Sequence, residues 1–343
     1  MCQLSVVIIT HNEAKGIAAS IESVQKALSH IADAQIILVD SCSTDDTVAI
    51  ARRYPVTVIE LDPDYFLSPA AGRYIGFQHS CGNYVYFMDG DMQLHEDWFT
   101  QAVPYLQQHP QLAGIAGQCR EQVFNEAGVL VTQRADRFAH ENKKASVPSL
   151  GGSVLYRRKV LEQTGAFNPY LANEEELELG LRIQTAGYTL ERLDIPMNTH
   201  DTLYYSNENP SGLTWRGIRR DWQMQRYLAL GRILRLLWSH DKCRLFLQRY
   251  NKCLFFVLIY ILGSLLLVAS LLTQQMLWFT AWGATLLLLF AVRLLLKRHL
   301  YDTLLYFLDY ALCAYGFIHG ILLPSAKANT YQPNIKVYKT DDA

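Results

Sequence analysis

The sequence lacks the features that mark several common classes of protein. Its seven cysteines show neither paired nor metal-ligand spacing, which fits reduced thiols in the cytoplasm. The first apolar run, Leu4–Thr10, follows no basic segment and is too short for a signal peptide, so we expect none. No Gly-rich phosphate loop comes after that run, which argues against a nucleotidyltransferase. The net charge of −1 over 343 residues predicts no particular partner.

Over the first 118 residues, short apolar runs alternate with stretches of helical character. Strands are predicted near residues 4–9, 35–39, 56–61, 84–88 and 112–116, and helices near 14–29, after 43–46, and near 69–80 and 96–108. The alternation predicts an α/β fold with a mostly parallel sheet and right-handed crossovers. A helix near 174–186 and a short strand near 189–193 complete a domain that we place at residues 1–212. The polar stretch 119–148 is expected to be a mobile loop beside the site.

Two segments near residues 253–272 and 276–296 are about 20 residues long and almost wholly apolar, the length that crosses a bilayer. They form a hairpin whose outer ends carry Lys and Arg and whose tip carries none, which predicts that the N-terminal domain lies on the cytoplasmic side of a membrane. A third segment at 304–323 contains Asp309 and His319. We favour a span there, with a helix in the membrane interface as the alternative. Residues 251–324 are thus the membrane region, and 325–343 a polar tail.

Positive charge is concentrated just before the first apolar segment. From Leu213 to Lys252, ten Lys and Arg residues stand against two Asp, a net charge of +8. The adjoining apolar segments favour anionic lipid or a lipid-linked phosphate as the partner, rather than nucleic acid. Mixed aromatic and Arg residues at helical spacing are typical of a helix in the membrane interface. We therefore expect residues 213–250 to form basic amphipathic helices, with acceptor phosphate contacts from Arg219, Arg220, Gln223 and Arg226.

Polar side chains follow three of the predicted strands at the point where each strand ends. Asp89-Gly90-Asp91 comes directly after the run at 84–88, and the glycine allows a sharp turn that aims both carboxylates at one point. Thr10-His11-Asn12-Glu13 follows the first strand, and Asp40 ends the second. Ligands of open α/β sheets gather at this edge, so these groups face one crevice. Two carboxylates on a tight turn suit Mg²⁺ or Mn²⁺ bound to a diphosphate, and Asp40 suits the imide N–H of uracil.

Together, these segments resemble the glycosyltransferase family 2 enzymes, which are inverting nucleotide-sugar transferases of the Rossmann-like GT-A fold. The likeness covers about residues 4–200, and its matching segments are Val6–Glu13, Val39–Thr47, Ala71-Gly72-Arg73, Asp89-Gly90-Asp91, Gly165-Ala166-Phe167, Glu175-Glu176-Leu177-Glu178 with Arg182 and Gly187-Tyr188, and Pro196 with His200. The chain departs from the family pattern at Cys42, where Gly is usual, at Tyr74, where Asn is frequent, and at Glu175-Glu176, where Glu-Asp is commoner. Gln223–Tyr227 also resembles the Gln-x-x-Arg-Trp signature of processive polysaccharide synthases.

The resemblance implies a role for each matching residue. Asp91 and His200 would hold the divalent metal on the diphosphate. Glu176 would be the general base that deprotonates the acceptor hydroxyl, with Glu175 as the alternative. Asp40 would bind the uracil and Asp89 the ribose, and the rest of the donor site would be formed by Thr10, Asn12, Glu13 and Arg73.

The sequence therefore predicts a membrane-anchored, metal-dependent inverting glycosyltransferase, and the resemblance implies a multi-pass protein of the bacterial inner membrane with a cytoplasmic catalytic domain. It would move a sugar from a nucleotide-diphosphate donor, UDP-linked in our prediction, onto a lipid-linked acceptor in cell-surface polysaccharide or glycolipid biosynthesis. The alternatives are a polyprenyl-phosphate sugar transferase, a processive polysaccharide synthase, and an inactive membrane-bound partner of a glycan assembly complex. The expected partners are the donor, the acceptor and membrane lipids, without nucleic acid.

Overall fold

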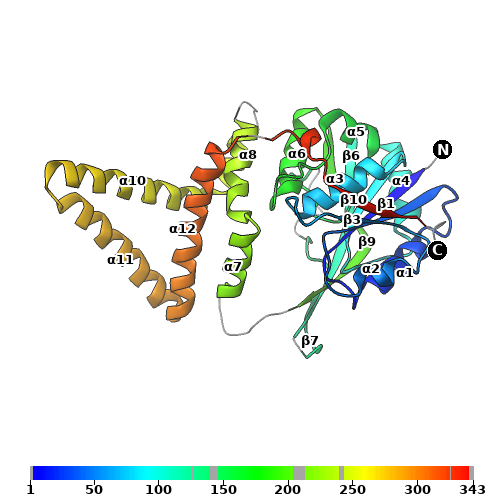
Figure 1. Cartoon of the computed structure of the whole chain (residues 1–343), viewed down its shortest axis with the longest axis horizontal. Coiled ribbons are helices and arrows are strands. Elements are labelled where there is room, and N and C mark those ends of the chain that lie inside the picture. Colours follow the sequence, from blue (N-terminus) through cyan, green and yellow to red (C-terminus); the bar gives the residue numbers. More distant parts are fainter. Residues whose placement is uncertain are drawn as a thin grey trace. The chain divides into compact units, whose positions relative to one another are not determined.

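The computed structural model describes residues 3–125, 127–139, 146–203, 213–238, 243–324 and 326–339 (Figure 1). The chain forms two compact units. The first unit comprises Met1–Tyr205 and Ala326–Ala343, and the second comprises Ser206–Ser325. The expected domain boundary at residue 212, the basic residue Lys242 and part of the expected loop at 119–148 lie outside the described residues.

The first unit is built on one mixed sheet. Across the described residues its strand order is β10-β3-β2-β1-β4-β8-β6-β9-β5, and β7 pairs with β6. The strands are β1 (Leu4–Thr10), β2 (Ala34–Asp40), β3 (Thr57–Leu61), β4 (Tyr84–Asp89), β5 (Met92–Leu94), β6 (Leu112–Phe124), β7 (Leu130–Arg134), β8 (Val154–Arg157), β9 (Thr189–Leu203) and β10 (Ile335–Tyr338). β1, β2, β3 and β4 run parallel, as the alternation of strands and helices predicted.

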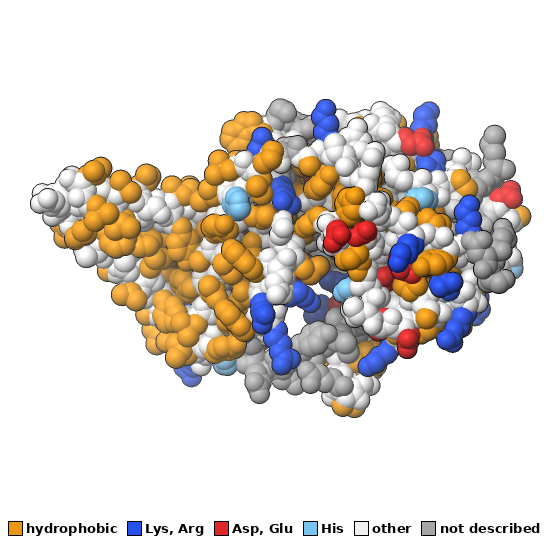
Figure 2. Space-filling view, viewed as in Figure 1, with side chains coloured by type: hydrophobic (Ala, Val, Ile, Leu, Met, Phe, Trp, Pro, Cys, Tyr) orange, Lys and Arg blue, Asp and Glu red, His pale blue; other side chains and the backbone are white. Residues whose placement is uncertain are grey.

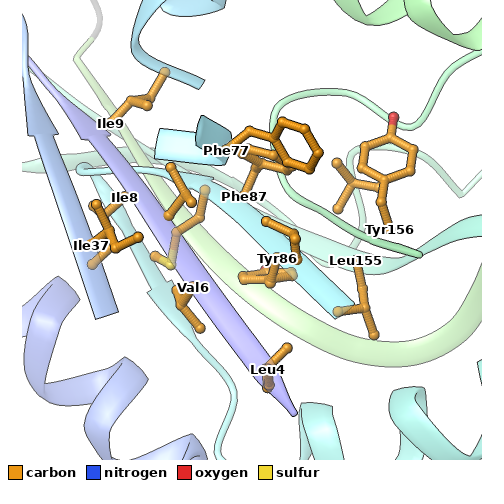
Figure 3. Packing of buried hydrophobic residues seen from close by; sticks show 14 of the residues in the cluster. Leu4, Val6, Ile8, Ile9, Ile37, Phe77, Tyr86, Phe87, Leu155 and Tyr156 are labelled. Atoms are coloured by element: carbon orange, nitrogen blue, oxygen red, sulfur yellow. The ribbon is translucent and has the colours of Figure 1, made fainter. Parts of the chain in front are cut away.

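The centre of the sheet is buried on both faces. Every residue of β1 is buried, which explains why apolar residues occupy consecutive positions from Val6 to Ile9 rather than alternating ones. Figure 3 shows side chains of β1 beside those of β4 and β8, with Phe87 and Tyr156 among them. The covering helices of this unit are α1 (Ile17–Ala27), α2 (Thr47–Ala51), α3 (Pro69–His79), α4 (Trp98–Gln108), α5 (Arg158–Thr164) and α6 (Glu175–Thr185).

Helix α3 lies close against the sheet because the residues on the face that contacts the sheet are small. Ser68 caps the helix by accepting a hydrogen bond from the amide of Ala71 at 3.1 Å, and Pro69 occupies its first turn. A Cβ atom on Gly76 would lie 2.2 Å from a methyl group of Val7 in β1, so the glycine is required for this approach. The close packing places Arg73, one turn earlier on the helix, beneath the end of β4.

Two regions differ from the sequence expectations. Residues 119–148 are not simply a loop: β6 continues to Phe124 and pairs with β7, and the expected short strand at 189–193 extends to Leu203 as β9. β6 and β9 run parallel along most of their lengths, so their backbone groups are paired although many of the side chains are polar and partly exposed. The tail also contributes a strand, because β10 adds antiparallel to β3.

The second unit consists of helices. They are α7 (Trp215–Gln223), the 3₁₀ turn η1 (Arg226–Leu228), α8 (Ala229–Leu237), α9 (Cys243–Arg249), α10 (Asn251–Thr273), α11 (Leu277–Lys297) and α12 (Leu300–Leu322), and a further 3₁₀ turn, η2 (Ala328–Thr330), lies in the first unit. In the described part of the chain, α10, α11 and α12 are long and apolar enough to cross a membrane. Figure 2 shows hydrophobic side chains over these three helices.

Helix α12 packs on α8 through glycine. A Cβ atom on Gly231 of α8 would lie 2.1 Å from the carbonyl oxygen of Phe317, and one on Gly320 would lie 2.3 Å from the carbonyl oxygen of Leu228. The Tyr227 hydroxyl donates a hydrogen bond to Asp309 of α12 at 2.6 Å. These contacts join α12 to the basic helical segment.

Candidate active site

The register of the parallel strands brings the polar strand ends together. Thr10 pairs with Asp40 across β1 and β2, and Ile9 pairs with Asp89 across β1 and β4. The amide of Gly90 donates to the carbonyl of Ile9 at 2.8 Å, which holds the turn after β4 against the end of β1. The sequence therefore predicted correctly that these three strands end at one edge of the sheet.

The loops after β1 and β2 interlock through Asn12. Its backbone has a φ of +59°, a left-handed conformation that Asn tolerates better than most residues. Its amide donates to Ser43 Oγ at 2.7 Å, and its Oδ1 accepts from the amide of Thr44 at 2.8 Å. The amide of Glu13 donates to Thr47 Oγ1 at 2.8 Å. Asn12 thus holds the rim of the crevice, and its carboxamide oxygen is engaged within the protein.

Asp40 lines a cavity beside these loops. Its carboxylate accepts hydrogen bonds from the Ser43 amide at 2.8 Å and from Ser43 Oγ at 2.5 Å, and its burial raises its pKa. The cavity has a volume of about 450 Å³. It is lined by Asp40, Cys42, Ser43, Thr44, Glu60, Leu61, Asp62, Pro63, Asn334, Ile335 and Lys336.

Arg73 joins the strand end of β4 to the start of α6. Its guanidinium is buried and donates from Nη2 to Asp89 Oδ1 and from Nη1 to Glu175 Oε1, both at 2.7 Å. Glu176 Oε1 lies 3.5 Å from the same Nη1. The sequence predicts Arg73 as a donor-binding residue, and in the structure two of its nitrogens hold acidic side chains at the strand end.

The glutamates in the first turn of α6 differ in exposure and in their partners. Glu175 has a 6% exposed side chain and is bonded to Arg73, whereas the Glu176 side chain is 22% exposed. Burial raises the pKa of both carboxyl groups, and the neighbouring Glu175 raises the pKa of Glu176 further. Both carboxylate oxygens of Glu178 accept hydrogen bonds from Arg182. Arg182 also donates to the backbone carbonyls of residues 164–166. Of these three acids, Glu176 has the most exposed side chain.

Asp91 and His200 meet although 109 positions separate them along the chain. β5 pairs with β9 so that Met92 lies opposite His200, and the imidazole Nε2 lies 3.0 Å from Asp91 Oδ2. Burial lowers the pKa of His200, but the hydrogen bond and charge of Asp91 outweigh this and raise it. Glu13 also has a raised pKa, of about 7. Its burial is the main cause, and the negative charges of Asp91, Asp45 and Asp89 add to it.

The pair fits a divalent cation that takes further ligands from a substrate. Among the described residues, Asp91 Oδ1 is buried without a hydrogen-bond partner, and no group of three or more His, Cys, Asp and Glu side chains is arranged around one point. Mg²⁺ and Mn²⁺ are commonly held by one or two protein ligands together with phosphate oxygens. Asp91 and His200 supply a donor set of this kind.

Two residues of the site were missed from the sequence. A Cβ atom on Gly152 would lie 2.6 Å from Arg73 Nη2 and 2.9 Å from Asp89 Oδ2, so a larger residue there would displace the ion pair. The Gly151-Gly152 pair was a visible signal of close backbone approach. Arg137 Nη1 lies 3.4 Å from His200 Nδ1, on a stretch expected to be a loop. Nothing in the pattern around Arg137 distinguished it.

The predicted acceptor-binding residues belong to the second unit. Arg219, Arg220 and Gln223 are exposed on α7, and Arg226 lies in η1. Asp221 pairs with Arg226 at 3.0 Å and with Arg220 at 3.5 Å. The helix that carries them begins at a Thr214 cap, whose hydroxyl accepts from the Gly217 amide at 3.0 Å.

A mixed sheet whose parallel strands end in these carboxylates, with an Asp-Gly-Asp turn after β4, is a GT-A fold. Residues 5–165 match the model of the family described as glycosyl transferase family 2. The chain therefore contains a glycosyltransferase family 2 domain of the GT-A fold, followed by long apolar helices.

Similar proteins include curated enzymes and solved structures. The glycosyltransferase AglE of Haloferax volcanii is 25% identical over 54% of this chain and 63% of its own length. The poly(ribitol-phosphate) β-N-acetylglucosaminyltransferase TarS of Staphylococcus aureus is 23% identical over 49% of this chain and 30% of its own. The matched region thus spans less than two thirds of either relative. TarS residues 1–349 have also been solved in complex with UDP-GlcNAc, with a TM-score of 0.48, 17% identity, and coverage of 77% of this chain and 80% of that one.

The structure of the mannosyltransferase PcManGT from Pyrobaculum calidifontis in complex with GDP-Man and Mn²⁺ has a TM-score of 0.52 to this chain. It is 18% identical and covers 93% of this chain and 87% of that one. This likeness shows the shared fold.

Proposed function

We propose that this protein is an inverting glycosyltransferase that moves a sugar from a nucleotide-diphosphate donor, a UDP-sugar in the first instance, to a lipid-linked acceptor. The observation that supports it most is the arrangement around Arg73. This buried cation holds Asp89 and Glu175, and leaves Glu176 partly exposed beside them. A carboxylate in that position has the exposure and the raised pKa that a general base requires.

In the proposed reaction, the acceptor hydroxyl gives its proton to Glu176 while the hydroxyl oxygen attacks the anomeric carbon of the donor sugar. The bond from that carbon to the diphosphate breaks on the opposite face, so the configuration inverts. Glu175 is the weaker candidate for the base, because Arg73 already occupies one of its oxygens at 2.7 Å. Arg73 is thus a positioning residue that fixes the start of α6 relative to Asp89.

Asp91 and His200 are the residues that would hold Mg²⁺ or Mn²⁺. The cation would neutralise negative charge on the departing diphosphate. Asp40 would accept the imide N–H of the base, and Asp89 would contact the ribose. Asn12 would contribute through the shape of the rim, since its carboxamide oxygen is bonded to Thr44. Thr10 would contact the donor through its hydroxyl, which is buried and has no hydrogen-bond partner among the described residues.

The return of the chain to the first unit supports a proposal for the membrane arrangement. β10 is hydrogen-bonded to β3, so the segments before α7 and after α12 belong to one sheet and lie on one side of a bilayer. A chain returns to the side it left only after an even number of crossings. We therefore propose that α10 and α11 cross as a hairpin and that α12 does not cross, contrary to our preference from the sequence.

Helix α12 has the character of a helix at the membrane surface. It is the least apolar of the three long helices, and it contains Asp302, Asp309 and His319. Asp309 accepts from Tyr227, and Arg235 donates to the carbonyls of Ile321 and Leu323 at the end of α12. These partners belong to the basic segment, whose arginines favour the anionic headgroup region of a cytoplasmic membrane surface.

Epitope tags in oriented membrane vesicles test this arrangement. Tags placed before residue 3 and after residue 339 should react on the same side, and a tag inserted in the link at 274–276 should react on the opposite side. A C-terminal tag that reacts on the side opposite the N-terminal one refutes two crossings.

A donor panel tests the enzymatic proposal. The full chain in detergent is incubated with UDP-, GDP- and dTDP-sugars, Mn²⁺ and a membrane lipid extract, and released nucleoside diphosphate and labelled lipid are measured. Labelled lipid identifies a lipid-linked acceptor, and a single product on a polyprenyl phosphate identifies the nearest alternative. Extended polymer points to a processive synthase. Absence of both transfer and donor hydrolysis with every sugar supports the inactive membrane-bound partner.

A further inference from the structure

The C-terminal segment returns from the apolar helices to form part of the candidate donor site. β10 pairs antiparallel with β3, placing Ile335 opposite Leu61 and Lys336 opposite Glu60. The amide of Asp62 donates to the carbonyl of Asn334 at 3.1 Å, which extends the pairing beyond the strand. The segment therefore lies along the outer edge of the sheet, where β3 ends beside Asp40.

An aromatic anchor fixes this segment. Tyr331 is 4% exposed, and its hydroxyl donates to the carbonyl of Phe66 at 2.7 Å. Its ring meets the rings of Tyr65, Tyr74 and Tyr170 edge to face, at centroid distances of 5.6 to 6.4 Å. Such pairs add stabilisation beyond the area they bury. Residues 334–336 are thus held by a buried neighbour on one side and a strand on the other.

The cavity of about 450 Å³ beside Asp40 has its outer wall in this segment. Its lining includes the carboxylates of Asp40, Glu60 and Asp62, and Lys336 is the cation among the lining residues. Lys336 and Glu60 are directly opposed in the antiparallel pair, so their side chains are on the same face of the sheet. The cavity has the size of a small-ligand site and combines an acceptor carboxylate with an ammonium donor.

We propose that residues 334–336 complete the nucleobase subsite, with the Lys336 ammonium donating to a base carbonyl beside the N–H that Asp40 accepts. This rests on the proposed function of the site. A ring N–H adjacent to a carbonyl occurs in uracil and guanine, whereas the corresponding ring nitrogens of adenine and cytosine are acceptors. The pairing of Asp40 with Lys336 therefore selects uridine or guanosine diphosphate over adenosine and cytidine diphosphate. The positive charge also offsets part of the repulsion between three carboxylates and an anionic donor.

Binding of nucleoside diphosphates to the full chain tests the proposal. UDP, GDP, ADP and CDP are titrated calorimetrically with Mg²⁺ present, and UDP or GDP should bind more tightly than the other two. Lys336→Met should weaken binding of the preferred nucleotide about tenfold or more, because a hydrogen bond from a charged donor is lost. Lys336→Arg should retain part of the affinity, and Lys339→Met, outside the cavity lining, should leave it unchanged.

The outcomes distinguish failure of the proposed donor site from failure of the proposed nucleobase contact. If the parent chain binds none of the four nucleotides, the proposed donor site fails, and the subsite fails with it. If the parent binds UDP or GDP and Lys336→Met binds it equally well, the nucleobase role of the segment is refuted while the donor site stands. Thermal unfolding distinguishes a merely structural effect: Lys336→Met should keep the parent's midpoint, and Tyr331→Ala should lower it.

Discussion

Replacement of Arg73 by Met tests whether one buried cation organises the site. Met preserves much of the apolar stem and removes the charge that Asp89 and Glu175 both use. Arg73 is 2% and Glu175 6% exposed, so the pair is buried, and removing one member leaves the other charge unpaired. Breaking a buried pair in this way costs about 3–5 kcal/mol. Asp89 contributes less to that figure because its side chain is 34% exposed and remains partly solvated.

For a domain of this size, about 1 kcal/mol corresponds to a shift of roughly 2–4 °C in the unfolding midpoint. Arg73→Met should therefore lower the midpoint of the first unit by roughly 6–20 °C. The assay is thermal unfolding of the full chain in detergent, with the exposed Arg53→Met as the matched control, which should change stability by less than about 0.5 kcal/mol.

A double-mutant cycle measures the coupling between Arg73 and Glu175. Glu175→Gln neutralises the stranded carboxylate, so Arg73→Met/Glu175→Gln should be less destabilised than the sum of the single variants, by about 1 kcal/mol or more. A loss of less than about 1 kcal/mol in Arg73→Met, or strict additivity in the cycle, shows that the ion pair does not hold α6 to β4.

The remaining predictions concern the base, the metal and the acceptor. Glu176→Gln should reduce kcat by roughly 10²-fold or more while donor affinity survives. Burial and the charge of Glu175 raise the pKa of Glu176, and a general base acts only when it is deprotonated. The kcat of the parent should therefore rise with pH, with a midpoint well above the pKa of an ordinary carboxyl group. A kcat that does not change over that pH range excludes Glu176 as the general base. Asp91→Ala should abolish turnover, and EDTA should abolish turnover of the parent. Added Mn²⁺ should restore the EDTA-treated parent but not Asp91→Ala. Full activity of the parent in EDTA excludes a required metal. The triple change of Arg219, Arg220 and Arg226 to Gln should raise the acceptor KM with donor affinity nearly unchanged, and an unaltered KM for a lipid acceptor makes these arginines anchors only.

The strand ends were predictable because their signals are local. An apolar run followed by a polar turn identifies a buried strand and its end, and the alternation with helices makes the strands parallel. Asp40 and Asp89 therefore had to lie at one edge of the sheet, flanking β1. The apolar helices were equally accessible, because length and composition suffice to recognise them.

Contacts between distant segments were not predictable in the same way. The proximity of His200 to Asp91 depends on the register of β9 against β5, and the sequence alone supplied only a resemblance for it. The extent of β6 and β9 was missed because strands with partly exposed polar side chains lack a clear apolar pattern. Backbone pairing stabilises such strands without leaving a strong signal in the side chains.

The sequence by itself determined the α/β alternation, the acidic strand ends, the apolar hairpin and the concentration of positive charge before it. Each is a property of neighbouring residues, set by periodicity, composition or a short motif. The tertiary structure decided which acidic side chain at the start of α6 is held by Arg73 and which remains open. It also decided that a polar tail pairs with β3 and lines the cavity beside Asp40. Burial and strand pairing depend on surfaces that come together only when the chain folds, so no local pattern could encode either outcome.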